Sequence, residues 1–378
     1  MQLRLVLALQ VSLLLLAGSS GLLAQAKKSG AAKPAPGKAT EEKPKFKAIW
    51  EPVPFNRDIE LFAIHCSGPE TCWVVGRKAT ILYTSDGGTT WKAQLGGDPD
   101  STDEHDFSKI VFLDATHGWV LSSRGKLLST SDGSAWSELG TISSLAKALW
   151  FVTPARGMLY ENSDSTSRSV MNVTTDGGRT WSRTQPCQLD ATIDGLARRL
   201  GCLPRDIHFV SPAVGFVGGA APLDMGTSAG MFGRTADGGN TWSYSLIPAS
   251  KHHVQEIEFW SEKDGIAVLD SGQVQWTADG GTTWTGSANS PSWRSWYAGA
   301  QGKILVGVRQ NGNQVGYSFD GGRTFMSRAA AFPAEVNGVA FPDPRHGYAV
   351  GRSGMVFRYR IVPIDYNKPG MFAALAAP

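Results

Sequence analysis

Six aspartates stand in near-identical octets, and repeated carboxylates are the side chains that acid–base catalysis or a calcium site requires. The clearest copies are TSDGGTTW, TTDGGRTW, TADGGNTW and TADGGTTW, and the looser copies are TSDGSAW and SFDGGRTF. The octet aspartates are Asp86, Asp132, Asp176, Asp237, Asp279 and Asp320. Equivalent copies spread around a repeat array cannot converge on one substrate, so we interpret the octet as a structural motif.

Each residue type of the octet suits a tight turn between two strands. The Asp carboxylate accepts hydrogen bonds from backbone N–H groups, the glycines adopt positive φ, and the Thr hydroxyl bonds the loop from within. The tryptophan offers a large apolar face for packing between sheets. The octet tryptophans are Trp91, Trp136, Trp181, Trp242 and Trp284.

Other residues capable of chemistry are scattered. The densest acidic stretch lies within residues 98–106 and could hold Ca²⁺, but it lacks the glycine and the terminal glutamate of an EF-hand loop, which favours a solvated loop. His117 and His346 each precede the glycine of a recurring turn, which favours a structural role. The sequence contains no HExxH motif. We predict no catalytic residue, no metal site and no cofactor.

Basic residues of the body concentrate around the third octet and the insertion after it. The arginines there are Arg179, Arg183, Arg198, Arg199 and Arg205. One hypothesis is a partner-binding patch, and the alternative is a solvated basic loop. The chain carries a net charge of +3, but the body from Ala48 onward carries about −3 once Arg4 and the basic tether are set aside. Nucleic-acid binding by the body therefore has no electrostatic support.

The four cysteines form two nearby pairs. Cys66 and Cys72 flank five residues, and Cys187 and Cys202 flank a 14-residue insertion. In an exported protein such pairs indicate disulfides, although cross-pairing stays open from spacing alone. Neither spacing is CxxC, which disfavours redox or zinc chemistry.

The N-terminus carries an export signal. A weakly positive start, an apolar run over Leu5–Leu16 and the small-residue site Ala24-Gln25-Ala26 predict a signal peptide over residues 1–26. The apolar run is shorter than the roughly 20 residues that span a bilayer, so we expect membrane attachment only through an uncleaved signal, if at all. A flexible basic tether over 27–47, a propeller over 48–365 and a C-terminal tail over 366–378 follow. We expect a periplasmic or extracellular location.

The spacing of the octets indicates a repeat architecture. Successive octet aspartates are separated by 46, 44, 61, 42 and 41 residues, a period typical of propeller blades. Upstream of each octet lie two β-like runs joined by a turn, as in KIVFLDATHGWVLS and IEFWSEKDGIAVLD, and this feature occurs seven times. Each unit therefore supplies about four strands, which is one blade.

The ends of the body complement each other. The last unit ends at GMVFRYRIVP without an octet, whereas FKAIWEPVPF over residues 46–55 is similar to the strand that follows an octet. We therefore predict an all-β, seven-bladed β-propeller with four-stranded antiparallel blades, in which the N-terminal strand pairs with the last blade and closes the ring. Closure would leave no exposed, incomplete sheet edge.

Two motifs carry a family resemblance. S/T-x-D-G-G-x-T-W resembles the Asp-box, or bacterial neuraminidase repeat. The octet combined with F-x-D/S-x-x-x-G-W/Y-x-V-G resembles the repeat of the photosystem II assembly and stability factor family, over essentially all of Trp50–Pro363. That resemblance implies a seven-bladed propeller that binds membrane-protein assembly intermediates, and an arginine-rich patch is associated with partner binding in the family.

The resemblance implies a non-enzymatic binding scaffold with a protein partner. The alternative is a secreted glycosidase or carbohydrate-binding propeller of the sialidase type. The central cavity discriminates between the two functions. Two or more convergent carboxylates with aromatic platforms would favour sugar chemistry, whereas a narrow, uncharged channel would favour a scaffold.

Overall fold

The computed structural model describes residues 46–364 apart from short gaps at 56, 164–167, 224–226, 248–250, 288–294, 299–304, 310–313 and 344. These residues all belong to one compact unit, Lys45–Pro378. The predicted signal peptide, most of the tether and the tail lie outside the described residues. None of the described residues forms a helix long and apolar enough to cross a bilayer.

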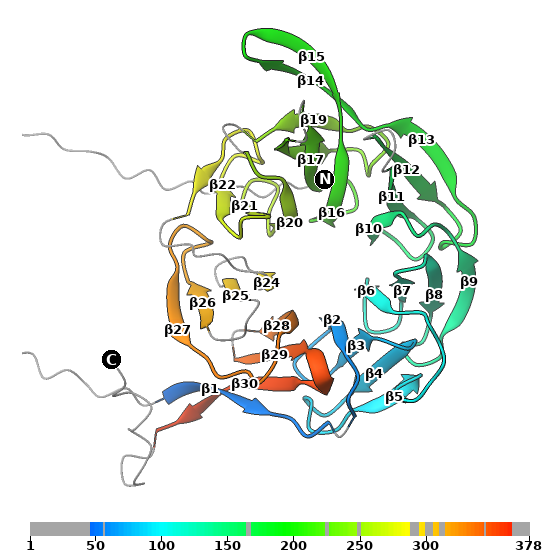
Figure 1. The fold of residues 1–378 in the computed structure, drawn as a ribbon, viewed down its shortest axis with the longest axis vertical. Helices are drawn as coiled ribbons and strands as arrows, with labels where there is room; N and C mark the ends of the chain where they lie inside the picture. Colours follow the sequence, from blue (N-terminus) through cyan, green and yellow to red (C-terminus); the bar gives the residue numbers. More distant parts are fainter. Residues whose placement is uncertain are drawn as a thin grey trace, which may run out of the picture. The chain divides into compact units, whose positions relative to one another are not determined.

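Seven four-stranded antiparallel sheets stand around a common centre, which confirms the predicted seven-bladed propeller (Figure 1). Blade one contains β2 (Leu61–Cys66), β3 (Cys72–Gly76), β4 (Thr80–Thr84) and β5 (Lys92–Leu95). Blade two contains β6 (Phe107–Phe112), β7 (Gly118–Ser122), β8 (Lys126–Thr130) and β9 (Ser137–Thr141). Blade three contains β10 (Ala146–Phe151), β11 (Gly157–Ser163), β12 (Arg168–Thr174) and β13 (Ser182–Pro186).

The insertion hairpin, β14 (Gln188–Ile193) and β15 (Leu196–Gly201), separates blade three from blade four. Blade four contains β16 (Leu203–Phe209), β17 (Gly215–Pro222), β18 (Ser228–Thr235) and β19 (Ser243–Leu246). Blade five contains β20 (Val254–Phe259), β21 (Gly265–Leu269), β22 (Val274–Thr277) and β23 (Thr285–Gly286). Blade six contains β24 (Ser295–Ala298), β25 (Leu305–Val308), β26 (Gln314–Ser318) and β27 (Met326–Ala329).

Blade seven closes the ring. It contains β28 (Val336–Asp343), β29 (His346–Gly351), a short 3₁₀ turn η2 (Arg352–Gly354), β30 (Val356–Pro363) and, as its outermost strand, β1 (Phe46–Pro52). Trp50 lies opposite Tyr359 in the β1–β30 register. This pairing confirms the predicted closure. Strand β1 begins at Phe46, two residues before the boundary predicted for the propeller.

Burial changes systematically from the second strand of a blade to its outer edge. The second strands read CWVVG, GWVLS and GIAVL in blades one, two and five, and every residue in them is buried. These strands are covered on both faces by neighbouring blades and therefore carry continuous apolar runs. The outermost strand of blade one, KAQL, is mostly exposed.

The second motif is a phenylalanine that packs over a glycine six residues later. A Cβ added at each of these glycines would lie 2.6 Å or less from the ring of its phenylalanine. The pairs are Phe112–Gly118, Phe151–Gly157, Phe209–Gly215, Phe259–Gly265 and Phe341–Gly347. Glycine is required at these positions because the ring occupies the space of a side chain.

The motif phenylalanines also join adjacent blades. The Phe151 ring stacks on Trp119 of blade two, with centroids 3.6 Å apart. The Phe259 ring stacks in the same way on Phe216 of blade four, also at 3.6 Å. At both contacts, an aromatic ring of one blade stacks on an aromatic ring of the preceding blade.

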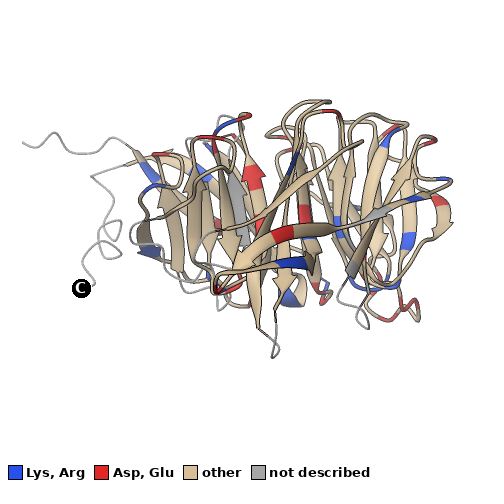
Figure 2. Ribbon diagram, turned by 90° about the horizontal axis from the view of Figure 1, so that it is seen from above, with Lys and Arg blue, Asp and Glu red and all other residues tan. Residues whose placement is uncertain are grey.

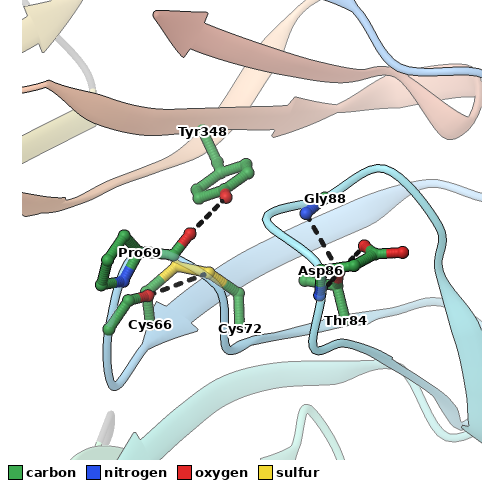
Figure 3. The surroundings of a disulfide bond; sticks show 8 residues. Cys66, Pro69, Cys72, Thr84, Asp86, Gly88 and Tyr348 are labelled. Carbon is green, nitrogen blue, oxygen red and sulfur yellow. Dashed lines mark hydrogen bonds between the residues drawn. A yellow bond between two sulfur atoms is a disulfide. The ribbon is translucent and has the colours of Figure 1, made fainter.

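In blade one a disulfide occupies the position of the phenylalanine and the glycine. Cys66 and Cys72 are six residues apart and directly paired between β2 and β3, as Phe112 and Gly118 are between β6 and β7. The loop that this disulfide closes lies beside blade seven, where the Tyr348 hydroxyl donates to the Pro69 carbonyl at 2.9 Å (Figure 3). The second predicted disulfide, Cys187–Cys202, closes the base of the insertion hairpin.

Candidate functional site

The octet forms a self-contained hydrogen-bonded turn between the two outer strands of a blade. In the first copy the Thr84 hydroxyl donates to Asp86 Oδ1 at 2.8 Å and accepts from the Gly88 N–H at 3.0 Å (Figure 3). Asp86 Oδ1 also accepts from the Thr90 N–H at 2.9 Å, and Oδ2 accepts from the Thr90 hydroxyl at 2.6 Å. Gly87 and Gly88 have φ of 69° and 76°, which a residue with a side chain adopts only with strain.

The other octets repeat this arrangement. Asp176, Asp237, Asp279 and Asp320 accept the same bonds from the Thr or Ser two residues before and the Thr four residues after. Asp132, in the looser copy, instead accepts from the N–H groups of Ser134 and Ala135, both at 2.8 Å. Because both carboxylate oxygens face the turn's own donors in the five fuller copies, they are poorly placed to bind a metal or substrate.

These hydrogen bonds stabilise the ionised carboxylates. Bonds from the Thr90 hydroxyl and N–H lower the pKa of Asp86 to about 2. The equivalent bonds from Thr241 lower the pKa of Asp237 to about 2. A carboxylate that is charged at every ordinary pH is a turn-stabilising group and not a proton donor.

The octet tryptophans lie between neighbouring blades, as predicted: the Trp136 indole donates to Gln94 Oε1 of blade one at 2.8 Å, and the Trp284 ring meets Phe232 of blade four edge-on at 5.3 Å. Trp136, Trp181, Trp242 and Trp284 each meet the motif phenylalanine of the same blade edge-on. Trp91 is the exception. Blade one has a disulfide in place of the phenylalanine, and Trp91 instead packs edge-on to Tyr348 of blade seven, with centroids 6.3 Å apart.

The octets also receive hydrogen bonds from the preceding blade. The Trp73 indole donates to the Gly133 carbonyl at 2.9 Å, and the Trp119 indole donates to the Gly177 carbonyl at 3.0 Å. Arg358 of blade seven donates to the Gly87 carbonyl at 3.0 Å across the closure. The octet therefore holds neighbouring blades together.

A cavity of about 400 Å³ lies where the innermost strands meet. The innermost strands β2, β6, β10, β16, β20 and β28 line it and surround the centre of the ring (Figure 1). Its charged lining comes from blades two, four and five, and Phe62 of blade one and Trp150 of blade three add aromatic rings. We name six of these residues the axial cluster: Lys109, Trp150, Asp206, His208, Glu256 and Glu258.

Ion pairs connect most of the axial cluster. Lys109 Nζ lies 3.3 Å from Asp206 Oδ1, which joins blade two to blade four past blade three. Asp206 Oδ2 accepts from the Ile257 N–H at 3.1 Å. His208 Nδ1 lies 3.3 Å from Glu258 Oε2. Burial disfavours the protonated form of His208, but the Glu258 carboxylate outweighs burial, and the pKa of His208 is raised.

Glu256 differs from the other two carboxyl groups of the cavity. Its side chain makes no hydrogen bond or ion pair with any residue that the structure describes. Burial, with the negative charges of Asp206 and Glu258, raises the pKa of Glu256 to about 8, while Lys109 acts in the opposite direction. The cavity thus contains three carboxyl groups. Three carboxyl groups beside Trp150 meet the criterion stated above for sugar chemistry, but ion pairs with Lys109 and His208 occupy two of the three.

The insertion between Cys187 and Cys202 is a two-stranded hairpin, and not a loop. Among the described strands, only β14 and β15 belong to no blade, and they project beyond the ring (Figure 1). Leu189 and Leu200 at the base pack with the disulfide and Met231 of blade four. The tip presents Leu196, whose side chain is 62% exposed.

The five predicted arginines lie on several different elements. Arg179 caps the third octet, and Arg183 on β13 pairs with Glu161 at 3.2 Å. Arg198 and Arg199 lie on β15, and Arg199 pairs with Asp190 across the hairpin at 3.0 Å. Arg205 lies on β16, the innermost strand of blade four. Lys/Arg and Asp/Glu are interspersed over the ring (Figure 2).

The remaining candidates have local partners. In the acidic loop, Asp103 pairs with His105 at 2.8 Å and Glu104 pairs with Arg124 at 2.6 Å. His117 and His346 each bond the aspartate three residues before, at the turn. Among the described residues no three His, Cys, Asp or Glu side chains are grouped to hold a metal ion.

The segment GTSAG, residues 226–230, fits the GxSxG pattern of serine hydrolases. Ser228 begins strand β18 in the middle of blade four, and no helix follows it. Ser228 therefore does not lie on the strand-to-helix turn that exposes a nucleophilic serine.

Sequence reasoning missed the axial cluster and the hairpin, although signals for both exist. Glu256 and Glu258 stand three and one residues before the motif Phe259, and Asp206 and His208 stand at the same positions before Phe209. Alternation with the buried phenylalanine places these residues toward the ring centre. The hairpin is signalled by Asp194-Gly195, whose φ values of 51° and 79° match a two-residue turn.

Comparisons with known proteins agree with this architecture. The family described as "Photosynthesis system II assembly factor YCF48" matches residues 43–184. The chain is 22% identical over 353 residues to the photosystem II stability/assembly factor HCF136, chloroplastic, of Arabidopsis thaliana, covering 86% of this chain and 81% of that protein. In sequence, the chain is therefore similar to photosystem II assembly factors.

Solved structures show how widely the fold is shared. The structure titled "YCF48 bound to D1 peptide" superposes with a TM-score of 0.59 at 18% identity, covering 82% of this chain and 96% of that one. A GH74 xyloglucanase from Xanthomonas campestris superposes with a TM-score of 0.58 at 12% identity, covering 82% of this chain and 53% of that one. These likenesses show the propeller fold alone, and the similarity to assembly factors comes from the sequence matches.

Proposed function

We propose that this assembly factor-like chain is a non-enzymatic, protein-binding scaffold of the cell envelope, exported by its N-terminal segment, that assists the assembly of a membrane-protein complex. The observation that carries the proposal is the insertion hairpin, which projects from a rigid ring and is closed at its base by Cys187–Cys202. Loops and insertions on a rigid scaffold are where binding residues concentrate. The relative solved with a D1 peptide supports a peptide segment as the client.

The hairpin combines an apolar tip with cationic side chains. Leu196 is exposed, and Arg198 and Arg199 follow it on β15. Asp190 and Asp194 balance the two arginines, so the hairpin has no net charge and long-range steering contributes little. Recognition would then depend on short-range contacts, with Leu196 as the anchor and the arginines as partners for acidic groups of the client.

The test is affinity capture by the tagged, signal-free chain from its native envelope, with the client identified by mass spectrometry. Leu196→Ala combined with Arg198→Glu and Arg199→Glu should abolish capture of that client. The matched control, Lys92→Glu with Lys263→Glu, reverses the same number of exposed charges on other blades and should leave capture intact. Equal capture by both variants would exclude the hairpin. Release of reducing sugar from β-glucans by the unmodified chain would contradict a non-enzymatic function.

A further inference from the structure

The axial cavity is unlike the rest of the ring because its lining is not repeated from blade to blade. In the equivalent position three residues before the motif phenylalanine, the blades carry Lys109, Ala148, Asp206, Glu256 and Gly338. Charge is thus concentrated in blades two, four and five. No blade contact depends on the Glu256 side chain, since that side chain bonds no described residue.

Most hydrogen-bonding capacity of the cavity is already used. Both Asp206 oxygens accept bonds, one from Lys109 and one from the backbone of Ile257. Glu258 faces His208. The carboxyl group of Glu256 is the one carboxyl in the described lining that is left without a partner. The Trp150 ring lines the same cavity, and its centroid lies 5.0 Å from that of His208.

We propose that the axial cavity binds a compact organic cation, a guanidinium or alkylammonium group, through the Glu256 carboxylate with the Trp150 ring as its aromatic wall. A cation supplies the charge that this carboxyl lacks, and an aromatic face attracts cations. Three carboxyl groups against one lysine and one histidine disfavour an anion. A sugar would find few free acceptors, and a divalent metal would find no grouped set of three ligands in the described residues.

The charges around Glu256 make such binding dependent on pH. The charged or titratable groups that line the cavity are Lys109 on β6, Asp206 and His208 on β16, and Glu258 on β20, whereas the described lining from β2, β10 and β28 is uncharged. Burial and the carboxylates of Asp206 and Glu258 hold the pKa of Glu256 at about 8. A bound cation favours the ionised carboxylate, so binding at pH 7 releases a proton. A carboxyl with this pKa is about tenfold more ionised at pH 9 than at pH 7.

The probe is N-acetyl-arginine amide, and the matched ligand control is the neutral isostere N-acetyl-citrulline amide. Calorimetric titration of the signal-free chain should show binding of the arginine amide alone, about tenfold tighter at pH 9 than at pH 7, with proton release revealed by two buffers of different ionisation enthalpy. Glu256→Gln should weaken binding at least tenfold at pH 9 and remove the pH dependence. Glu262→Gln, at the exposed turn of the same blade, should change neither.

Two sources could present this cation. Tighter binding of a five-residue peptide centred on arginine than of agmatine would identify a client side chain, and the reverse would identify a free amine; either supports the site. The proposal is overturned if the arginine amide fails to bind at 10 mM, if the citrulline amide binds equally, or if Ca²⁺ or a neutral oligosaccharide binds tighter. It stands apart from the proposed function, because loss of client capture by the hairpin variant leaves this titration unchanged.

Discussion

Substitution of Gly265 by alanine tests whether the phenylalanine–glycine pair controls blade packing. A Cβ on Gly265 would lie 2.5 Å from Cγ of Phe259, whereas carbon atoms in contact lie about 3.5–4.0 Å apart. The ring would have to move by about 1 Å. It cannot move freely, because Phe216 stacks on it at 3.6 Å and Trp284 meets its edge. Overpacking of this kind costs about 1–3 kcal/mol.

Gly286→Ala is the matched control in the same blade. Gly286 also has an ordinary φ, but a Cβ there would meet nothing within 4 Å. Its substitution should be neutral or stabilise by up to about 1 kcal/mol, since alanine restricts the unfolded chain. Urea unfolding followed by tryptophan fluorescence should give Gly265→Ala a free energy of unfolding about 2 kcal/mol below that of the unmodified chain. Equal midpoints for the two variants would refute the steric argument.

A double-mutant cycle tests whether the Phe259 ring causes the loss of stability in Gly265→Ala. If the Phe259 ring is the obstacle, Gly265→Ala should cost clearly less when Phe259 is replaced by leucine, because the two residues share one contact. An unchanged cost in the Phe259→Leu background would assign the effect to the backbone and not to the ring.

Three further outcomes follow from the same contacts. Cys66→Phe with Cys72→Gly should restore the phenylalanine–glycine pair in blade one and unfold at a higher urea concentration than Cys66→Ser with Cys72→Ser, whereas equal midpoints would contradict the equivalence. Trp50→Ala removes edge contacts with Phe341 and Tyr359 and should cost about 3–5 kcal/mol, with early proteolysis in β1; undiminished stability would contradict closure by this strand. The pKa values of Asp86 and Asp237 are lowered to about 2, so the stability that their ionised carboxylates contribute is complete above pH 4 and is lost as the pH falls toward 2. Asp86→Asn should therefore make unfolding less sensitive to acid between pH 4 and pH 2, as measured by circular dichroism.

The repeat made most of the fold predictable. Octet spacing and the paired upstream runs gave seven blades, and the similarity of residues 46–55 to the strand after an octet gave the β1–β30 pairing that the structure contains. These features are predictable because each is a local pattern repeated many times, so that chance agreement is small. The disulfides were predictable because their partners are close in sequence.

The candidate site was not predictable by the same means. Glu256 and Glu258 alternate with apolar residues as in any half-exposed strand, and the sequence does not state that β20 faces β16 and β6 across one cavity. The Lys109–Asp206 pair joins residues 97 positions apart, and its existence depends on the radius of the ring. The distance between two such side chains depends on how several blades pack around the centre, and their separation in the sequence does not determine it.

The repeated motif residues must be the same in each blade that has the motif, whereas the residues that line the axial cavity can differ from blade to blade. This difference explains why the motifs and the candidate site consist of different residues. The octet aspartates and the motif phenylalanines make equivalent contacts in each blade that contains them. Replacing any one of them therefore removes the same kind of contact, whichever blade is changed. The positions that line the axial cavity share no common contact: in blades two to five the residue directly before the motif phenylalanine is Val111, Trp150, His208 or Glu258. A ring held by its repeated contacts tolerates such variety at its centre, as it tolerates an added hairpin between blades three and four. Differences in ligand among propellers of this kind should therefore map to axial positions and insertions, and not to the octets that identify them.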